Sequence, residues 1–274
     1  MADPRKTSLN TATVRQQWTL EQCIEGCARH GFAGIAPWRD MLAGMGVERA
    51  AKHIRDAGLS VSGLCRGGMF TASDAAGLEK ARDDNRRAVD EAAAIGAECV
   101  VLVVGGLPAG SKDIAEARNQ IEDGIAAMLA YARQANMPLA IEPLHPMYAA
   151  DRACVNTMRH ANDLCDRLGE GVGIALDVYH VWWDPELPAQ IARAGKGRLL
   201  AFHVCDWLVP TRDVLLDRGM MGDGAIDIPA IRAEVEGQGF DGLYEVEIFS
   251  AENWWKRDPD EVMRTILARI ETAV

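Results

Sequence analysis

The chain has 274 residues, of which 49% are hydrophobic, with a formal net charge of −11 at pH 7 and a pI of about 5.1. This length can bury a large core, and α/β barrels reach about 250 residues as one domain, so we expect a single domain over residues 1–274. The acidic balance repels a phosphate backbone, and no stretch rich in lysine and arginine interrupts it, which argues against a nucleic-acid partner.

Targeting and redox signals are weak in this sequence. Residues 1–10 include basic side chains but no apolar segment follows them, and apolar runs such as 99–104 fall far short of the ~18 residues of a membrane span. We therefore expect a cytoplasmic protein with no membrane partner. Seven cysteines form no Cys-x-x-Cys pair, which predicts reduced thiols in the core.

Short apolar runs alternate with amphipathic segments from the N-terminus onward. Thr19 and Gln22 are spaced as a capping box at a helix start, and Gly31 is placed to end that helix. The run 99–104 is rich in β-branched residues, as is typical of a strand covered on both faces. In order, we predict strand 8–14, helix 19–30, strand 34–38, helix 47–57, strand 59–65, helix 73–94, strand 99–104 and helix 114–132.

The alternation continues without a compositional break in the second half. Asp184-Pro185 and Asp258-Pro259 each predict an N-cap followed by a first-turn proline. A longer loop covers 207–225. We predict strand 138–142, helix 156–168, strand 172–178, helix 184–194, strand 198–205, helix 229–236, strand 243–249 and a final helix from 258.

Eight predicted strands, each followed by a helix, favour a (β/α)8 TIM barrel. Parallel strands joined by right-handed helical crossovers close most naturally into a barrel at this number and length. A doubly wound open sheet is the alternative. However, no Gly-x-Gly-x-x-Gly follows the first strand and the chain contains no P-loop.

Four successive strands end in residues that bind hard metal ions: Glu142, Asp177, His203 and Glu247. In a barrel these ends face one mouth, so the side chains are expected to converge. Buried carboxylates are costly unless paired or metal-bound, and one divalent cation compensates all three. The donor set favours Mn²⁺ or Mg²⁺, with Co²⁺ and Zn²⁺ as alternatives. Separate salt bridges or capping contacts are the competing interpretation, and Glu245 shares a strand face with Glu247 as a candidate.

The motifs around these residues resemble those of the xylose-isomerase-like TIM-barrel superfamily of sugar and sugar-phosphate isomerases and epimerases. They are Ile-Glu-Pro at 141–143, Leu-Asp-x-x-His at 176–180, Phe-His-x-x-Asp at 202–206, Gly-Asp-Gly at 222–224 and Glu-x-Glu-Ile-Phe at 245–249. The resemblance covers nearly the whole chain and is nearest to the ketose 3-epimerase and inositol-catabolism branch. It implies one Mn²⁺-type ion held by Glu142, Asp177, His203 and Glu247. Glu247 is selected over Glu245 because the family's ligand directly precedes the apolar-Phe end of that strand.

The implied function is a divalent-metal-dependent sugar isomerase or epimerase acting on a ketose or a related keto-polyol. An α-hydroxyketone chelating the ion has an acidified C–H, because the metal stabilises the enediolate as a Lewis acid. Glu142 and Glu247, which flank the substrate in related enzymes, are the expected catalytic base and acid. His180 matches the family's Asp-x-x-His and is expected to hydrogen-bond a substrate oxygen.

Other candidate substrate contacts lie just beyond strand ends. His145 follows Glu142 by three residues and either assists the site or orders its loop. Arg218 and Asp223 lie in the long loop, where a substrate clamp is useful, and Arg66 is a similar candidate; solvated charges are the alternative. Four tryptophans either wall a sugar face, contact another subunit or pack loops: Trp38, Trp207, Trp254 and Trp255.

Three other functions remain open at this level. A dehydratase or lyase on a keto-sugar or keto-inositol uses the same ion and the same first proton abstraction. A nuclease like the superfamily's trinuclear-zinc DNA-repair enzymes needs further strand-end histidines, which 36–39, 64–67 and 103–107 lack. A non-catalytic sugar-binding barrel is disfavoured because both glutamates are retained. The expected partner is a small sugar or keto-polyol, in free rather than phosphorylated form because no glycine-rich phosphate cradle is evident, and a homodimer or tetramer is compatible with the sequence.

Overall fold

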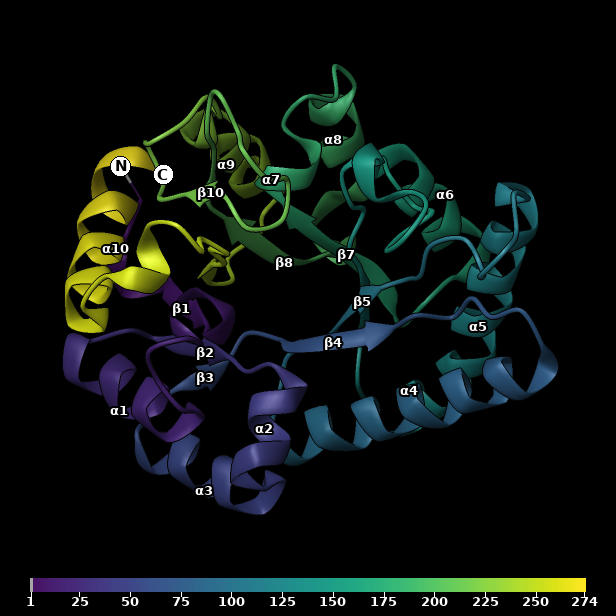
Figure 1. The fold of residues 1–274 in the computed structure, drawn as a ribbon, viewed down its shortest axis with the longest axis horizontal. Coiled ribbons are helices and arrows are strands. Elements are labelled where there is room, and N and C mark those ends of the chain that lie inside the picture. Colours follow the sequence, from purple (N-terminus) through teal and green to yellow (C-terminus); the bar gives the residue numbers. More distant parts are fainter. Residues whose placement is uncertain (1) are drawn as a thin grey trace.

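The computed structural model describes residues 2–274 and forms one parallel sheet surrounded by helices (Figure 1). Its strands pair in the order β3-β2-β1-β11-β8-β7-β6-β5-β4. Since β3 and β4 are consecutive in the chain, the sheet returns on itself as a nearly closed barrel, and the predicted TIM-barrel fold is confirmed. The nine strands are β1 Thr7–Asn10, β2 Gly34–Ala36, β3 Ser60–Val61, β4 Leu64–Gly68, β5 Val100–Val103, β6 Leu139–Ile141, β7 Val172–Asp177, β8 Leu199–Val204 and β11 Tyr244–Val246.

The predicted third strand, 59–65, is two strands in the structure. β3 pairs with β2, whereas β4 pairs with β5, and only Ser62 and Gly63 separate them. Isolated bridges between Trp38 and Cys65 and between Val61 and Ala97 join the two sides of this seam. The chain therefore changes neighbours within one apolar run, which a periodic pattern does not reveal.

Helices cover the outer face of the barrel (Figure 1). The predicted capping box of Thr19 and Gln22 is confirmed, as is the Asp258 cap of the last helix. Arg39–Met45 and Val178–Val181 are additional short helices. The helices are α1 Leu20–His30, α2 Arg39–Met45, α3 Val47–Asp56, α4 Ala75–Ile95, α5 Ile114–Gln134, α6 Met158–Leu168, α7 Val178–Val181, α8 Leu187–Arg198, α9 Ile228–Gly237 and α10 Pro259–Ala273.

The expected N-cap at Asp184 is wrong. The Asp184 carboxylate instead accepts the backbone N–H of Glu186 in a turn, at 2.9 Å, and helix α8 begins at Leu187. Pro188 occupies its first turn, because the proline needs no helical donor there. The first strand also ends early, at Asn10, whose side chain accepts the N–H of Ala12 and opens a 3₁₀ turn.

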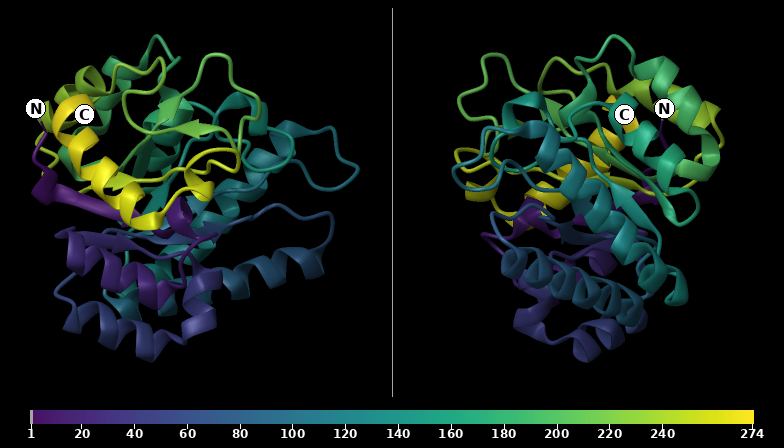
Figure 2. Two further views of the ribbon diagram at one scale, coloured as in Figure 1. Left: turned by 60° about the vertical axis from the view of Figure 1, so that its left-hand side comes forward. Right: turned by 90° about the vertical axis from the view of Figure 1, so that its right-hand side faces the viewer.

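The two ends of the chain lie side by side in every view (Figures 1 and 2). β1 pairs in parallel with β11, and Arg29 of α1 forms an ion pair with Asp260 of α10. The first and last elements thus close one side of the barrel.

The barrel interior is lined mainly by small apolar side chains, whereas the larger aliphatic core lies between the strands and the helices. The small interior residues leave space along the barrel axis for polar groups. They are Cys65, Cys99, Val101, Ala140, Ala175 and Ala201. All seven cysteines are buried and free, as predicted. Within residues 2–274 the helices are too short or too polar to span a bilayer.

The long loop after β8 is folded back on itself. Asp206 and Trp207 form β9, which pairs antiparallel with β10, Arg218–Gly219. The buried Asp206 carboxylate accepts the backbone N–H groups of Gly222, Gly224 and Ile226 at 2.9–3.0 Å. These bonds fix the path of the segment that carries Arg218.

Candidate active site

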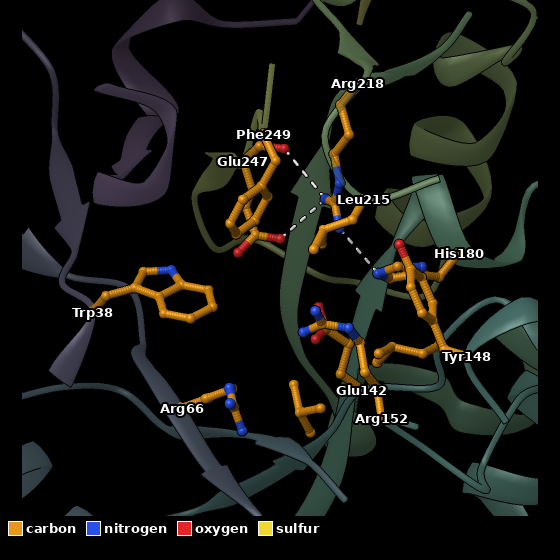
Figure 3. Close-up of a pocket in the computed structure, with 12 residues that line it drawn as sticks. Trp38, Arg66, Glu142, Tyr148, Arg152, His180, Leu215, Arg218, Glu247 and Phe249 are labelled. Atoms are coloured by element: carbon orange, nitrogen blue, oxygen red, sulfur yellow. Dashed lines mark hydrogen bonds and ion pairs between the residues drawn. The ribbon is translucent and has the colours of Figure 1, made fainter. Parts of the chain in front are cut away.

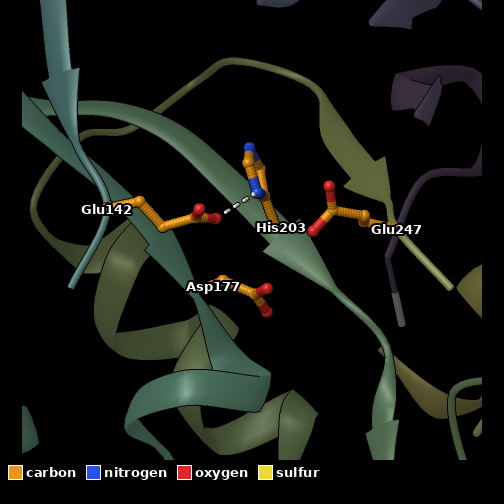
Figure 4. Close-up of side chains that lie close together, drawn as sticks. All are labelled: Glu142, Asp177, His203 and Glu247. Carbon is orange, nitrogen blue, oxygen red and sulfur yellow. Dashed lines mark hydrogen bonds and ion pairs between the residues drawn. The ribbon is translucent and has the colours of Figure 1, made fainter. Parts of the chain in front are cut away.

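The four strand-end residues converge at the carboxyl mouth of the barrel (Figure 4). Asp177 is the last residue of β7, His203 lies in β8, and Glu142 and Glu247 directly follow β6 and β11. One oxygen or nitrogen atom from each side chain lies within 4.8 Å of the others, and all four residues are buried. This separation suits a single divalent ion with three carboxylate ligands and one imidazole ligand.

The charge balance of the cluster also fits a cation. His203 Nδ1 lies 3.1 Å from Glu142 Oε1. Burial lowers the pKa of His203, but the Glu245 and Glu142 carboxylates outweigh it and raise that pKa well above its usual value. Burial also raises the pKa of Glu247. Both shifts compensate for crowded negative charge by retaining protons, a role that a bound divalent ion would take over.

Glu245 lies beneath the cluster, on the same strand face as Glu247. Its carboxylate accepts hydrogen bonds from Asn10 Nδ2 at 2.8 Å and from Ser62 Oγ at 2.7 Å. Its Oε1 lies 3.4 Å from His203 Nε2. Asn10 Nδ2 also donates to Glu247 Oε1 at 2.9 Å. The structure thus places Glu247 with the other three donors and Glu245 behind the histidine.

Arg218 is buried beside the cluster rather than solvated. Its Nη1 lies 2.9 Å from Asp177 Oδ2. The same Nη1 lies 3.1 Å from Glu247 Oε2, a contact drawn in Figure 3. Its guanidinium also stacks over the ring of Tyr179, 4.4 Å from the centroid. The Arg218 charge lowers the pKa of Asp177 against the opposing effect of burial. Arg218 therefore offsets the negative charge of two of the three carboxylates in the four-residue cluster.

His180 contacts the same arginine. Its Nε2 lies 3.1 Å from Arg218 Nη2, and its Nδ1 lies 3.2 Å from the backbone nitrogen of His145. Burial lowers the pKa of His180 to about 3, so the ring is neutral near pH 7. A neutral ring has one acceptor nitrogen, so its tautomer decides whether Arg218 or the His145 backbone N–H donates to it.

A pocket opens over Glu142 and Glu247 (Figure 3). Aromatic and aliphatic side chains share its walls with arginines, a combination suited to a small polyhydroxy ligand. The lining residues are Trp38, Arg66, Val103, Glu142, Leu144, Tyr148, Arg152, His180, Leu215, Arg218, Glu247 and Phe249.

A family model for the xylose isomerase-like TIM barrel matches residues 24–268 of the chain. The chain belongs to this family. A solved protein from Sinorhizobium meliloti 1021 is 59% identical to this xylose isomerase-like barrel, with 99% of each chain covered and a TM-score of 0.97. The inosose isomerase of Bacillus velezensis is 22% identical over 281 residues, covering 98% of this chain and 97% of that protein.

Solved proteins of lower sequence identity share the fold. A solved IOLI protein with a bound zinc atom is 20% identical, covers 98% of this chain and 99% of its own, and has a TM-score of 0.83. D-psicose 3-epimerase, solved with D-fructose, is 16% identical over 97% of each chain with a TM-score of 0.79. At these identities the likeness establishes the barrel alone.

The structure divides the remaining predicted site residues of this xylose isomerase-like barrel into two groups. Trp38 and Arg66 line the pocket with His180 and Arg218. The His145 ring instead stacks on Trp207, with centroids 5.0 Å apart, and accepts the N–H of Met147.

Three of the other predicted residues lie in contacts between loops and helices. Asp223 pairs with Arg269 at 2.9 Å. Trp254 is buried, and Trp255 Nε1 donates to the carbonyl of Ala12 at 2.9 Å. None of these three residues lines the pocket over Glu142 and Glu247.

Sequence reasoning missed several residues of the site. Asn10 ends β1 and lies at the same mouth as the four donors, so a search of every strand end would have included it. Tyr148, Arg152 and Leu215 come from loops, and their positions depend on the loop path. Ser62 lies in the gap between β3 and β4, which the sequence pattern did not predict.

Proposed function

We propose that the chain is a divalent-metal-dependent isomerase or epimerase that acts on a ketose or related keto-polyol. The observation that carries this proposal is the buried convergence of Glu142, Asp177, His203 and Glu247 beneath an open pocket. Those four residues would hold the ion, for which Mn²⁺ is our first choice among Mn²⁺, Mg²⁺, Co²⁺ and Zn²⁺. The family membership and its isomerase and epimerase members support the same chemistry.

A bound divalent ion supplies Lewis acidity toward the carbonyl and hydroxyl oxygens of an α-hydroxyketone. Glu142 and Glu247 approach from different sides of His203 (Figure 4) and line the pocket. One glutamate, as the carboxylate, removes the proton next to the carbonyl, and the other, as the protonated carboxyl, gives its proton to the resulting enediolate. The raised pKa of Glu247 suits it to hold that proton. Return to the opposite face of the same carbon inverts that centre, whereas return to the neighbouring carbon isomerises the sugar.

His180 and Arg218 are the proposed substrate-orienting groups. The His180 ring and the Arg218 guanidinium border the pocket from the Asp177 side. Arg218 is an N–H donor held by buried contacts, so it suits hydrogen bonding to a substrate oxygen that gains negative charge. The neutral His180 ring can donate to or accept from a substrate hydroxyl, according to its tautomer. His145 is proposed to position the His180 ring through its backbone N–H, which lies next to His180 Nδ1.

The test is a screen of ketoses and keto-inositols with added Mn²⁺ in deuterated water. Deuterium incorporation into the C–H next to the carbonyl without loss of water supports an isomerase or epimerase. Loss of water instead identifies a dehydratase on the same site. Wild-type protein that exchanges no deuterium with any ketose would overturn the proposal.

Two variants connect activity with the site. Glu142→Gln keeps the side-chain volume and is expected to abolish exchange, with far-ultraviolet circular dichroism confirming the fold. Glu122→Gln, on the exposed face of α5 where it pairs with Arg167, is the matched control and should retain activity. Full activity of Glu142→Gln would remove Glu142 from the chemistry.

A further inference from the structure

Arg66 and Arg152 reach the pocket beside Glu142 and lack close acidic partners. Figure 3 draws both side chains reaching toward the hollow, and no interaction line joins either of them to the other lining residues. Among residues 2–274, Arg66 forms no salt bridge within 4.0 Å, and the Glu142 carboxylate acts on its charge only from a greater distance. Arg152 is 3.7 Å from the exposed carboxylate of Asp151, a contact of little energetic value.

The local backbone explains why Arg66 faces the mouth. The register between β4 and β5 shifts between Cys65 and Gly67, which marks an irregularity in the pairing at Arg66. Cys65 lies in the barrel interior, whereas a Cβ on Gly67 would meet Asn85 of α4, outside the barrel. The irregularity lets Arg66 also face the pocket, a common use of bulges beside functional sites.

Arg152 comes from the loop that follows β6. Its guanidinium lies 5.7 Å from the ring centroid of Tyr148, another lining residue. Side-chain exposure of 38% leaves its donors free toward the mouth. Arg66 and Arg152 line the same pocket, and burial, followed by the positive charge of Arg152, lowers the pKa of Arg66.

The third arginine of the pocket lining is already compensated. Arg218 pairs with Asp177 and Glu247. Arg66 and Arg152 lie in the same pocket of a chain with a net charge of −11, and among the residues that the structure describes the only carboxylate within salt-bridge distance of either is the exposed Asp151 beside Arg152. This arrangement suits an anionic ligand.

We propose that the substrate carries a carboxylate or phosphate group, which Arg66 and Arg152 bind while its keto-polyol part faces Glu142 and Glu247. This inference rests on the proposed function for the keto-polyol part alone. The mouth holds four buried carboxylates, which are those of Glu142, Asp177, Glu245 and Glu247. With the charges of Arg218 and one divalent ion added, one excess negative charge is left. The two arginines change this to one excess positive charge, which a monoanionic group neutralises.

The first test measures anion binding by protein loaded with Mn²⁺, the state in which the two arginines leave one excess positive charge. Inorganic phosphate and acetate are titrated separately by calorimetry or by thermal shift, at fixed ionic strength. Arg66→Gln and Arg152→Gln should each weaken binding of the preferred anion by about 10- to 100-fold, as expected for charge-assisted hydrogen bonds. Arg86→Gln, an exposed arginine of α4 paired with Asp83, is the control and should bind as wild type does.

The second test compares ketoses that differ in charge, in protein loaded with Mn²⁺. D-fructose, D-fructose 6-phosphate and 5-keto-D-gluconate are assayed by deuterium exchange. One anionic ketose should exceed the neutral one in kcat/KM by at least about tenfold, and the same anion type should bind more tightly in the first test. The ratio of anionic to neutral kcat/KM should fall toward one in both arginine variants, mainly through KM.

The outcomes separate this inference from the proposed function. Equal kcat/KM for neutral and anionic ketoses, with equal loss in the arginine variants, would overturn the anionic substrate while leaving the isomerase intact. Anion binding that depends on both arginines, without exchange of any ketose, would support the anion site and overturn the isomerase. Anion binding unchanged in both variants would remove Arg66 and Arg152 as the binding groups.

Discussion

Replacing Glu245 with glutamine isolates the effect of the charge behind His203. Glutamine keeps the volume of this buried side chain, and its amide can still bond Asn10 and Ser62, which contact the carboxylate at 2.8 and 2.7 Å. The change therefore removes a negative charge 3.4 Å from His203 Nε2 with little loss of packing. A carboxylate behind a ligating histidine raises the basicity of the ring and fixes its orientation.

We expect Glu245→Gln to weaken Mn²⁺ binding by about 10- to 100-fold, which is about 1.4–2.7 kcal/mol. The metal-free protein should keep its unfolding temperature, because the lost attraction between Glu245 and His203 is offset by weaker repulsion among the buried carboxylates. The combination of weaker metal binding and unchanged metal-free stability distinguishes a tuning role from a structural one.

Isothermal titration of Mn²⁺ into chelator-stripped protein measures the affinity, and thermal unfolding without metal measures the stability. Glu48→Gln, on the exposed face of α3, is the matched control and should change neither quantity. A Glu245→Gln affinity within about twofold of wild type would refute the reasoning, since the carboxylate would then contribute nothing through His203.

Three further predictions follow from the same contacts. Chelation should lower the free energy of unfolding in urea by about 2.7 kcal/mol relative to protein with Mn²⁺ at 100 times its Kd, and equal stabilities would contradict a metal site. Burial depresses the pKa of His180 to about 3, so the unfolded chain binds a proton at this residue below pH 6.5 and the folded chain does not. The free energy of unfolding should therefore fall below pH 6.5 by up to about 1.36 kcal/mol per pH unit until pH 3 is approached. In urea unfolding, His180→Asn should lose less of this free energy between pH 6.5 and pH 5 than wild type, and an equal loss would contradict the reasoning. Asp206→Asn should lower stability by roughly 2–3 kcal/mol and speed hydrogen exchange at 207–225, since Asp206 accepts the N–H groups of Gly222, Gly224 and Ile226; unchanged exchange would show that the loop is held by other contacts.

The sequence alone determined the barrel and the four converging donors. Strand and helix periods are local properties, and eight alternations of them leave few ways to close a sheet. Once the strands were ordered, Glu142, Asp177, His203 and Glu247 had to share one mouth, because parallel strands of a barrel end on the same side.

Tertiary structure decided which side chains contact those four donors. It placed Glu245 behind His203, buried Arg218 between Asp177 and Glu247, and moved the His145 ring away to Trp207. Each of these placements depends on contacts between residues far apart in the chain, and on a loop path that Asp206 sets through hydrogen bonds.

The placement of Arg66 and Arg152 in one pocket also depended on tertiary structure. An irregular register between β4 and β5 directs one arginine, and the loop after β6 carries the other. Neither a strand period nor a motif predicts that these two arginines lie in the same pocket, because one comes from an irregular strand and the other from a loop. The sequence thus specified where chemistry occurs, whereas the folded loops decided which charges face the substrate.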